Sequence, residues 1–316
     1  MSTLRLGTRR SALARTQSTW VADQLRAAGH EVDLVEIVTE GDVSGELLTA
    51  IGGTGVFASA IRHALHQNRI DLAVHSLKDL PTTPEEGLVL GALPVREDSR
   101  DVLVARDGLT LGELPAGSTI GTGSPRRTAQ LAALGLGLEI RPIRGNVDTR
   151  LALVTSGTLD AVVLARAGLA RLGRLGHVTE VLDPIQMLPA PGQGALAVEC
   201  RADRSDVLAA LLPLDDPDTR TCVTAERALL AALEAGCTAP IGALAEVVDG
   251  EDGLELSLRA FIGSQDGAVE LRRSLVGPYT EPETLGARLA QIFLEDGAAA
   301  LRDPRPVDHH PSEHVS

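Results

Sequence analysis

The stretch DLAVHSLKDLP, residues 71–81, decides the fold. It is a short β-rich run followed by a polar turn, and similar β-rich runs alternate with helical periodicity on both sides of it. This βαβ pattern predicts an α/β fold in which helices cover a parallel or mixed sheet, and the pattern occurs twice. The expected strands are 4–7, 32–38, 71–76, 118–123, 138–143 and 160–165, and the expected helices are 11–28, 56–68, 125–134 and 147–156.

Two segments suggest that the chain crosses between the two α/β units twice. The charged stretch PVREDSRD (94–101) separates the units, and LPAPGQGA (188–195) ends the second unit and precedes another strand-like run, ALAVEC. Paired α/β domains joined by two linkers close on ligands in the crevice between them. We therefore expect a discontinuous first α/β domain (1–96 and 194–214) and a second α/β domain (100–190).

The pattern changes after residue 217. One amphipathic helix, three strand-like runs and a last helix predict a small α+β C-terminal domain over 218–302. The tail, 303–316, is rich in Pro and His and has no apolar periodicity, so we expect it to be disordered. The expected segments of this domain are 219–236, 241–248, 254–262, 268–276 and 281–296.

Composition excludes several classes of function. The chain has 316 residues, with 29 Lys and Arg against 43 Asp and Glu, which gives a formal net charge of −14, and only 2% of its residues are aromatic. Such a protein is a poor partner for nucleic acid or an anionic membrane. No apolar run is long enough to span a membrane, and no signal-peptide pattern follows the first arginines, so we expect a cytoplasmic protein. Three widely spaced cysteines provide neither a disulfide framework nor a metal site.

Arginines gather at three predicted helix starts, around residues 9–11, 124–127 and 144–150. A helix N-terminus has unpaired N–H groups and a partial positive charge, and a neighbouring Arg adds a bidentate donor for carboxylate or phosphate. A single such junction is more simply a capped helix with solvated arginines. Three of them facing one cleft predict a site for a ligand with several negative charges. The glycines of IGGTGVF (51–57) lack the spacing of a nucleotide-binding loop.

Three further residues are candidates for chemistry. Lys78 is the only lysine in the chain and follows a strand, where cleft residues gather. Asp79 beside it is a candidate for acid–base work or for stabilising a cation, and its alternative is a structural ion pair or turn cap. Cys237 lies in a loop after a helix, where an exposed thiol could attack an electrophile. Cys200 and Cys222 are interpreted as small core residues, and His75 as a hydrogen-bonded histidine at a strand end.

These residues lie in runs that resemble the porphobilinogen deaminase family, also called hydroxymethylbilane synthases. The resemblance covers residues 3–300 in order, and HSLKDLP, RGNVDTR and GQGA are the most specific of its runs. The runs that carry it are RLGTRRSALA, GDV with IGGTGVF, AVHSLKDLP, GTGSPRR, IRGNVDTRL, LARAGLARLG, LPAPGQGALAVEC and LEAGC.

The resemblance implies a transferase of tetrapyrrole biosynthesis with three domains, the first two similar to periplasmic binding proteins. Its members join four porphobilinogen molecules head to tail with release of ammonia and hydrolyse off the linear hydroxymethylbilane. A dipyrromethane cofactor, held by a thioether that corresponds to Cys237, is the primer, and Asp79 corresponds to the catalytic aspartate. Residues that correspond to cofactor-binding positions are Lys78, Ser124, Arg126, Arg127 and Arg150, and those near the substrate are Arg9, Ser11, Gln17, Arg144 and Arg171.

The resemblance makes chemical sense of the arginines, because each pyrrole ring carries an acetate and a propionate. It implies no metal and no macromolecular partner, and we expect a monomer. The chain departs from the family at Thr54 and Ser59, where lysines are usual, so the role of this loop in covering the cleft is in question. The competing interpretations are an anion-binding protein without chemistry, which would not need Cys237, and a cysteine-dependent transferase, for which no base near that thiol is evident.

Overall fold

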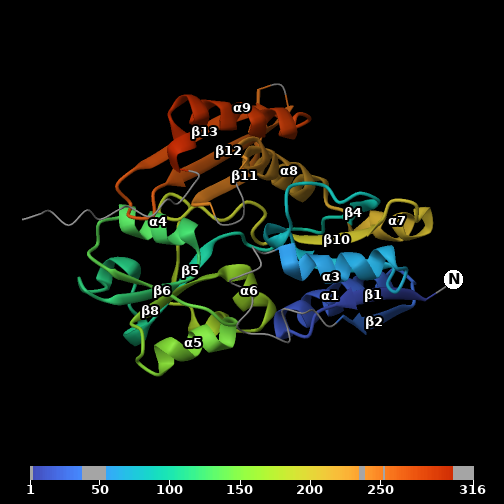
Figure 1. Cartoon of the computed structure of the whole chain (residues 1–316), viewed down its shortest axis with the longest axis horizontal. Coiled ribbons are helices and arrows are strands. Elements are labelled where there is room, and N and C mark those ends of the chain that lie inside the picture. Colours follow the sequence, from blue (N-terminus) through green and yellow to red (C-terminus); the bar gives the residue numbers. More distant parts are fainter. Residues whose placement is uncertain (1–2, 38–54, 235–238, 252, 302–316) are drawn as a thin grey trace, which may run out of the picture.

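The computed structural model describes residues 3–37, 55–234, 239–251 and 253–301. Three sheets make up its framework, each with helices packed against it (Figure 1). Two are five-stranded mixed sheets that lie side by side, and the third is a three-stranded antiparallel sheet above them in that view. The expected α/β fold class with an added α+β part is therefore confirmed. No helix among these residues is both long and apolar enough to cross a membrane.

The first sheet has the strand order β2-β1-β3-β10-β4, with β1 parallel to β2 and β3 and with β10 antiparallel to both its neighbours. Side chains of β3 alternate between the two faces, as the period of a strand requires. Helices α1 and α7 pack on one face and α3 on the other. The elements of this unit are β1 (Leu4–Thr8), α1 (Ala12–Ala27), β2 (Val32–Glu36), α3 (Gly55–His66), β3 (Leu72–Ser76), β4 (Leu88–Ala92), β10 (Leu196–Arg201) and α7 (Ser205–Leu211).

The second sheet repeats this arrangement with the order β7-β6-β8-β5-β9, in which β6 is parallel to β7 and β8 and β5 is antiparallel to its neighbours. Helix α4 packs on one face, and α5 and α6 pack on the other. The elements of this unit are β5 (Asp101–Ala105), β6 (Thr119–Thr122), α4 (Pro125–Ala133), β7 (Glu139–Pro142), α5 (Val147–Thr155), β8 (Ala161–Ala165), α6 (Arg166–Arg171) and β9 (Glu180–Val181).

The chain passes between these two units twice, once between β4 and β5 and once between β9 and β10. The two crossings touch each other closely. Gly194 has a φ of +88°, and a Cβ atom there would lie 2.3 Å from the backbone oxygen of Glu97 in the first crossing. Only glycine fits this position without moving one of the crossings.

The third sheet, β11-β12-β13, packs one face against α8 and α9. Its other face meets α4 of the second unit through Leu244 and Phe261, which contact Ala129 (Figure 1). The three-stranded sheet is thus seated on the second unit. The elements of this third part are α8 (Pro217–Ala232), β11 (Ile241–Gly250), β12 (Gly253–Gly263), β13 (Glu270–Pro278) and α9 (Pro282–Glu295).

Candidate active site

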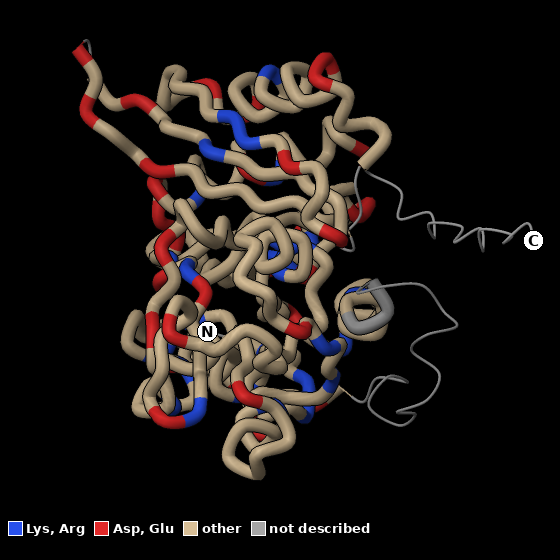
Figure 2. Tube along the Cα trace, turned by 90° about the vertical axis from the view of Figure 1, so that its left-hand side faces the viewer, with Lys and Arg blue, Asp and Glu red and all other residues tan. Residues whose placement is uncertain are grey.

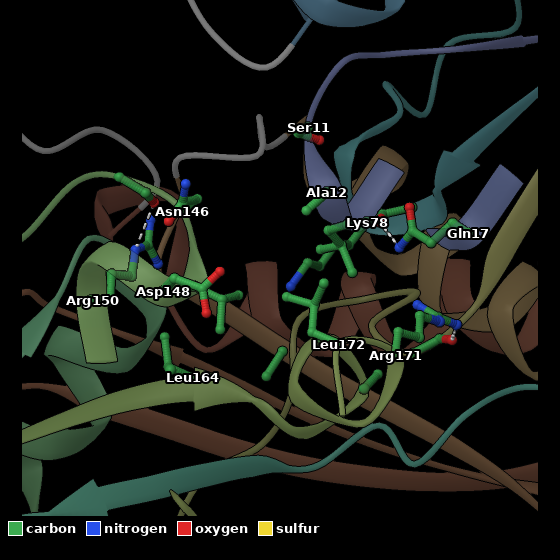
Figure 3. Close-up of a pocket in the computed structure, with 18 of the residues that line it drawn as sticks. Ser11, Ala12, Gln17, Lys78, Asn146, Asp148, Arg150, Leu164, Arg171 and Leu172 are labelled. Atoms are coloured by element: carbon green, nitrogen blue, oxygen red, sulfur yellow. Dashed lines mark hydrogen bonds between the residues drawn. The ribbon is translucent and has the colours of Figure 1, made fainter. Parts of the chain in front are cut away.

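The two α/β units enclose a cavity of about 320 Å³. The start of α1 and the turn after β3 line it from the first unit, and the start of α5, the end of β8 and α6 line it from the second. Figure 3 shows Lys78 on one side of this cavity and Arg150 on the other. A smaller cavity of about 90 Å³ adjoins it. The residues that line both cavities are Ser11, Leu13, Gln17 and Ser76.

Two of the three predicted helix starts open directly on the larger cavity with their capping side chains. Ser11 Oγ accepts the N–H of Ala14 at 3.3 Å, and Asn146 Oδ1 accepts the N–H of Thr149 at 2.8 Å. Ser124 occupies the N-cap position of α4, but its side chain makes no capping hydrogen bond. The expected helix starts are confirmed, and those of α1 and α5 direct partial positive charge at the cavity from opposite sides.

Asp79 belongs to the smaller cavity. It ends a short 3₁₀ turn, Leu77–Asp79, that directly follows β3. Leu77 is fully buried, and its N–H donates to Ala195 O at 3.0 Å, so the turn is anchored while Asp79 stays exposed. Among the described residues, no side chain or backbone group forms a hydrogen bond or ion pair with the carboxylate of Asp79. The geometry therefore does not support the alternative of a turn cap or structural ion pair.

Lys78 lies in the larger cavity, where its surroundings strongly affect its charge. Its Nζ donates to Gln193 Oε1 at 3.3 Å. Burial among protein atoms lowers the pKa of Lys78 to about 8, and the attraction of Asp79 offsets this only in part. An anion bound beside the ammonium would favour its charged form.

A buried carboxylate, Asp101, holds the second arginine junction. It accepts hydrogen bonds from Arg126 at 2.7 Å and from Arg127 at 2.8 Å, and Gln193 Nε2 donates to it at 2.8 Å. Burial opposes ionisation of Asp101, but the two arginines outweigh it and its pKa is lowered. Arg127 lines the larger cavity, whereas Arg126 is buried behind it and donates to Leu188 O.

Sequence reasoning missed Asp101 and Gln193. The sequence placed Asp101 at the end of a charged linker, but it begins β5 and is completely buried. Gln193 was part of a quoted run without a role, yet its amide joins Lys78 of the first unit to Asp101 of the second. The only available signal was that a polar run, GQGA, stands between apolar segments.

Arg150 and Arg171 are cations without a carboxylate partner among the described residues. Arg150 Nε donates to Gly145 O at 3.0 Å, and an Nη of Arg171 donates to Gly194 O at 2.7 Å. Burial lowers the pKa of both, and the nearby Arg127 lowers that of Arg150 further. Both side chains line the larger cavity, where bound anions would offset the burial of both charges and the repulsion between Arg150 and Arg127.

Of four more residues that the sequence singled out, three line the smaller cavity and one, Arg144, lines neither. Arg9 lines the smaller one, and Gln17 Nε2 donates to Ser76 Oγ at 3.0 Å in the wall that both share. Arg144 is exposed in the loop before α5. His75 lies at the end of β3 as expected, but its Nε2, 3.3 Å from the buried Glu199 carboxylate, has no partner in hydrogen-bond geometry among the described residues, so the expected hydrogen bond is not confirmed.

The expectation that Cys200 and Cys222 are core residues is confirmed. Cys200 and Cys222 are buried, and burial raises their pKa values to about 11 and about 12. Cys237 lies outside the described residues, as do Thr54 and the histidines of the tail. Ser59 is exposed on α3. Within the described part of the chain, no group of three or more His, Cys, Asp and Glu side chains could hold a metal ion.

The larger cavity carries a local excess of positive charge. Lys78, Arg127, Arg150 and Arg171 line it against one carboxylate, Asp148, which is paired with Arg174 at 3.1 Å. Figure 2 shows acidic and basic residues interspersed over the rest of the trace. The excess is therefore a property of the cavity and not of a basic face, and it suits a small ligand with several carboxylates.

Comparison with known proteins gives matches over nearly the whole chain. The sequence model described as porphobilinogen deaminase, dipyromethane cofactor binding domain, matches residues 4–209, and that of the porphobilinogen deaminase C-terminal domain matches residues 220–295. Porphobilinogen deaminases of Mycobacteroides abscessus and Mycobacterium tuberculosis are both 58% identical over 303 residues, which cover 94% of this chain and 99% and 98% of theirs. Among solved structures, lipoprotein Tp32 of Treponema pallidum is 11% identical, covering 67% of this chain and 90% of its own, with a TM-score of 0.43.

Proposed function

Because the chain belongs to the porphobilinogen deaminase family, we propose that the two adjoining cavities hold the primer and the incoming substrate of its reaction. The enzyme condenses four porphobilinogen molecules head to tail, releases ammonia at each step and hydrolyses the product to hydroxymethylbilane. The observation that carries the proposal is that four cations and two helix starts line one cavity while Asp79 lines the adjoining one.

The residues of the larger cavity fit the dipyrromethane cofactor. Its two rings carry four carboxylates, and the cavity offers Lys78, Arg127 and Arg150, of which Arg127 also has a buried Nε without a hydrogen-bond partner. We assign these three, with Ser124 and Arg126 at the start of α4, to holding the cofactor. Arg126 acts from behind the cavity, by fixing Asp101 and through it Arg127. When bound, the cofactor supplies the pyrrole carbon to which the first substrate is joined.

The smaller cavity and its rim suit the substrate. Arg9 and the start of α1 at Ser11 offer donors for the acetate and propionate, and Gln17 forms the wall shared with the larger cavity. We assign these residues, with Arg144 and Arg171, to the substrate and the growing chain. This division places the new ring beside Asp79 and the earlier rings among the cations of the larger cavity.

Asp79 stabilises the positive charge that develops on the substrate. When the bond between the methylene carbon and nitrogen breaks, the protonated amine leaves as ammonia with the bonding electrons, and the positive charge left on the methylene carbon spreads to the pyrrole nitrogen. A carboxylate that accepts the pyrrole N–H stabilises this charge in the transition state. The same oxygen can take up the proton that the neighbouring ring loses when the new carbon–carbon bond forms.

We propose that Cys237 carries the cofactor through a thioether, since the other two cysteines are buried and their raised pKa values make them unreactive. Intact mass of the purified protein tests this. We expect a mass above that of the sequence by one dipyrromethane unit, located on the peptide with Cys237, and Cys237→Ser without adduct or activity. Cys200→Ser serves as control and should keep both. An unmodified but fully active protein would refute the covalent primer.

We propose the three domains that the sequence predicts. The first comprises 1–96 and 194–214, the second 100–190 and the C-terminal domain 218–302. Limited proteolysis at the crossings tests these bounds. We propose a monomer, because one chain provides residues from both units to complete the cavity. Sedimentation of the loaded enzyme checks this state. A cytoplasmic location is likewise a prediction, which cell fractionation tests.

A further inference from the structure

A third cavity, of about 430 Å³, lies beside the catalytic cavity, and of its lining only Gln17 and Arg171 have a part in the assignments above. It is formed where α1 and α6 come together near the first crossing (Figure 1). We call it the Trp20 cavity. Its lining residues are Thr16, Gln17, Trp20, Val95, Arg96, Glu97, Ala170, Arg171 and Leu196.

The Trp20 cavity adjoins the catalytic one and shares two lining side chains with it. Gln17 and Arg171 line both cavities, so they form the wall between them. Gln17 is held by its hydrogen bond to Ser76, and Arg171 by its hydrogen bond to Gly194 O. A ligand too long for the catalytic cavity would pass this wall to reach the next space.

One side of the Trp20 cavity is apolar and open to solvent. Trp20 is the only tryptophan of the chain and is 43% exposed, and Val95 in the first crossing is 73% exposed. Leu196 and Ala170 complete the apolar lining. Large apolar side chains that stay exposed around a concave surface are typical of a binding site, and an indole face suits a flat aromatic ring.

The polar side offers one available cation. Arg96 is paired with the buried Glu226 at 2.7 Å, and Glu97 is paired with Arg166 at 3.1 Å, so these two charges are already compensated. Arg171 is attracted by Glu97 but forms no ion pair with it, and its hydrogen-bond partner among the described residues is a backbone oxygen. The cavity therefore combines an aromatic face with a guanidinium, which matches a pyrrole ring with carboxylate arms.

We propose that the Trp20 cavity binds pyrrole rings of the growing chain once the catalytic cavity is full, with a ring against Trp20 and a carboxylate on Arg171. This inference rests on the proposed function. Pockets that enclose one drug-sized ligand measure roughly 300–1,000 Å³. The larger catalytic cavity, of about 320 Å³, lies at the lower end of that range and the smaller one, of about 90 Å³, lies below it, whereas two primer rings and four added rings form a much larger ligand.

The test compares Trp20→Glu with Trp20→Phe and with Thr19→Glu, an equally charged change at an exposed neighbour on α1 that does not line the cavity. Each variant is given limiting porphobilinogen, and intact mass shows how many rings each molecule carries. We expect Trp20→Glu to accumulate forms with one or two added rings and to make bilane about tenfold more slowly or less. Trp20→Phe and Thr19→Glu should resemble the wild type. A Trp20→Glu enzyme that passes through all loaded forms in wild-type proportions would overturn the proposal.

Fluorescence of the wild-type enzyme gives a second readout that does not depend on a variant folding. Because Trp20 is the only tryptophan, its emission should change when the later rings are added. Emission that is the same in every loaded form would overturn the proposal. The resting mass separates the two levels of inference: a protein without dipyrromethane contradicts the proposed function as well, whereas a loaded protein with normal elongation in Trp20→Glu contradicts only the Trp20 cavity.

Discussion

Asp79 shows how a single exposed carboxylate can be assigned a chemical role. It lies in the smaller cavity at the end of an anchored turn, and no described residue neutralises it by a hydrogen bond or ion pair. We expect Asp79→Asn, which keeps the shape but removes the charge, to lower the rate of bilane formation by about a hundredfold or more. Asp79→Glu should be less harmful. The measurement is the steady-state rate of protein whose mass shows the primer in place, and a near-normal Asn variant would contradict the role.

Lys78 makes a prediction about pH. Its pKa is lowered to about 8 before any anion binds, so the ammonium is charged below that pH and neutral above it. Binding of the primer's carboxylates to the empty protein should therefore weaken as the pH rises. We expect primer assembly in cofactor-free enzyme to slow several-fold between about pH 7 and pH 9.

The matched variants are Lys78→Arg, whose charge persists at these pH values, and Lys78→Met, which has none. In Lys78→Arg, primer assembly should stay fast and nearly independent of pH over this range. In Lys78→Met it should be slow at all pH values. A wild-type profile that does not change over this range, with Lys78→Met equally fast, would show that the ammonium does not take part.

The sequence was sufficient to locate site residues that directly follow a strand, but not the residues that form hydrogen bonds with the site from distant parts of the chain. Lys78 and Asp79 could be predicted because a β-rich run precedes them, and a local pattern is enough to place them. Asp101 and Gln193 act on residues that are 25 to 115 positions away in the chain. No local pattern carries such pairings, which only the folded arrangement creates.

The start of helix α4 is tied to strand β5 by a buried ion pair. Arg126 is buried and paired with Asp101, so Arg126→Leu leaves a fully buried carboxylate with fewer partners. Loss of one partner of a buried ion pair typically costs about 3–5 kcal/mol. We expect this variant to unfold at lower denaturant concentration and to contain little primer.

Arg150→Leu is the contrasting change, on helix α5. Arg150 has no carboxylate partner among the described residues and is repelled by Arg127, so its loss should leave the empty protein equally stable or more so. It should still impair primer loading. Denaturant midpoints and adduct content of the two variants separate a structural arginine from a binding one, and identical stabilities would contradict the distinction.

Helix starts were predictable at this scale because capping chemistry is local, as Ser11 and Asn146 confirm. Strand β5 was not, because its first residue, Asp101, ends a run of charges that resembles a linker. The residues Val102 to Val104 favour a strand, and the structure compensates the buried charge of Asp101 with two arginines from a helix 24 residues later. Tertiary contacts thus override local polarity.

For the whole molecule, the two crossings could be predicted from the changes in pattern at 94–101 and 188–195. The seating of the third sheet on α4 could not, since Leu244 and Phe261 are ordinary apolar strand residues in the sequence. This contact places the three-stranded sheet, with α8 packed on its other face, in the same body as the arginines of α4. A primer held by Cys237 would then join the third domain to the cations of the other two.

That connection predicts that the loaded enzyme is more resistant to heat than the empty one. A group that binds only the folded state stabilises it, and the primer's carboxylates relieve the repulsion among Lys78, Arg127 and Arg150 that the empty cavity retains. We expect wild-type protein to melt above Cys237→Ser, by about 2–4 °C for each kcal/mol gained. Scanning calorimetry of both proteins in the same buffer measures the difference.

Adding Arg150→Leu to Cys237→Ser should not lower the melting temperature further, because this cation stabilises the fold only through the primer. Equal melting temperatures of loaded and empty enzyme would mean that the primer does not connect the domains.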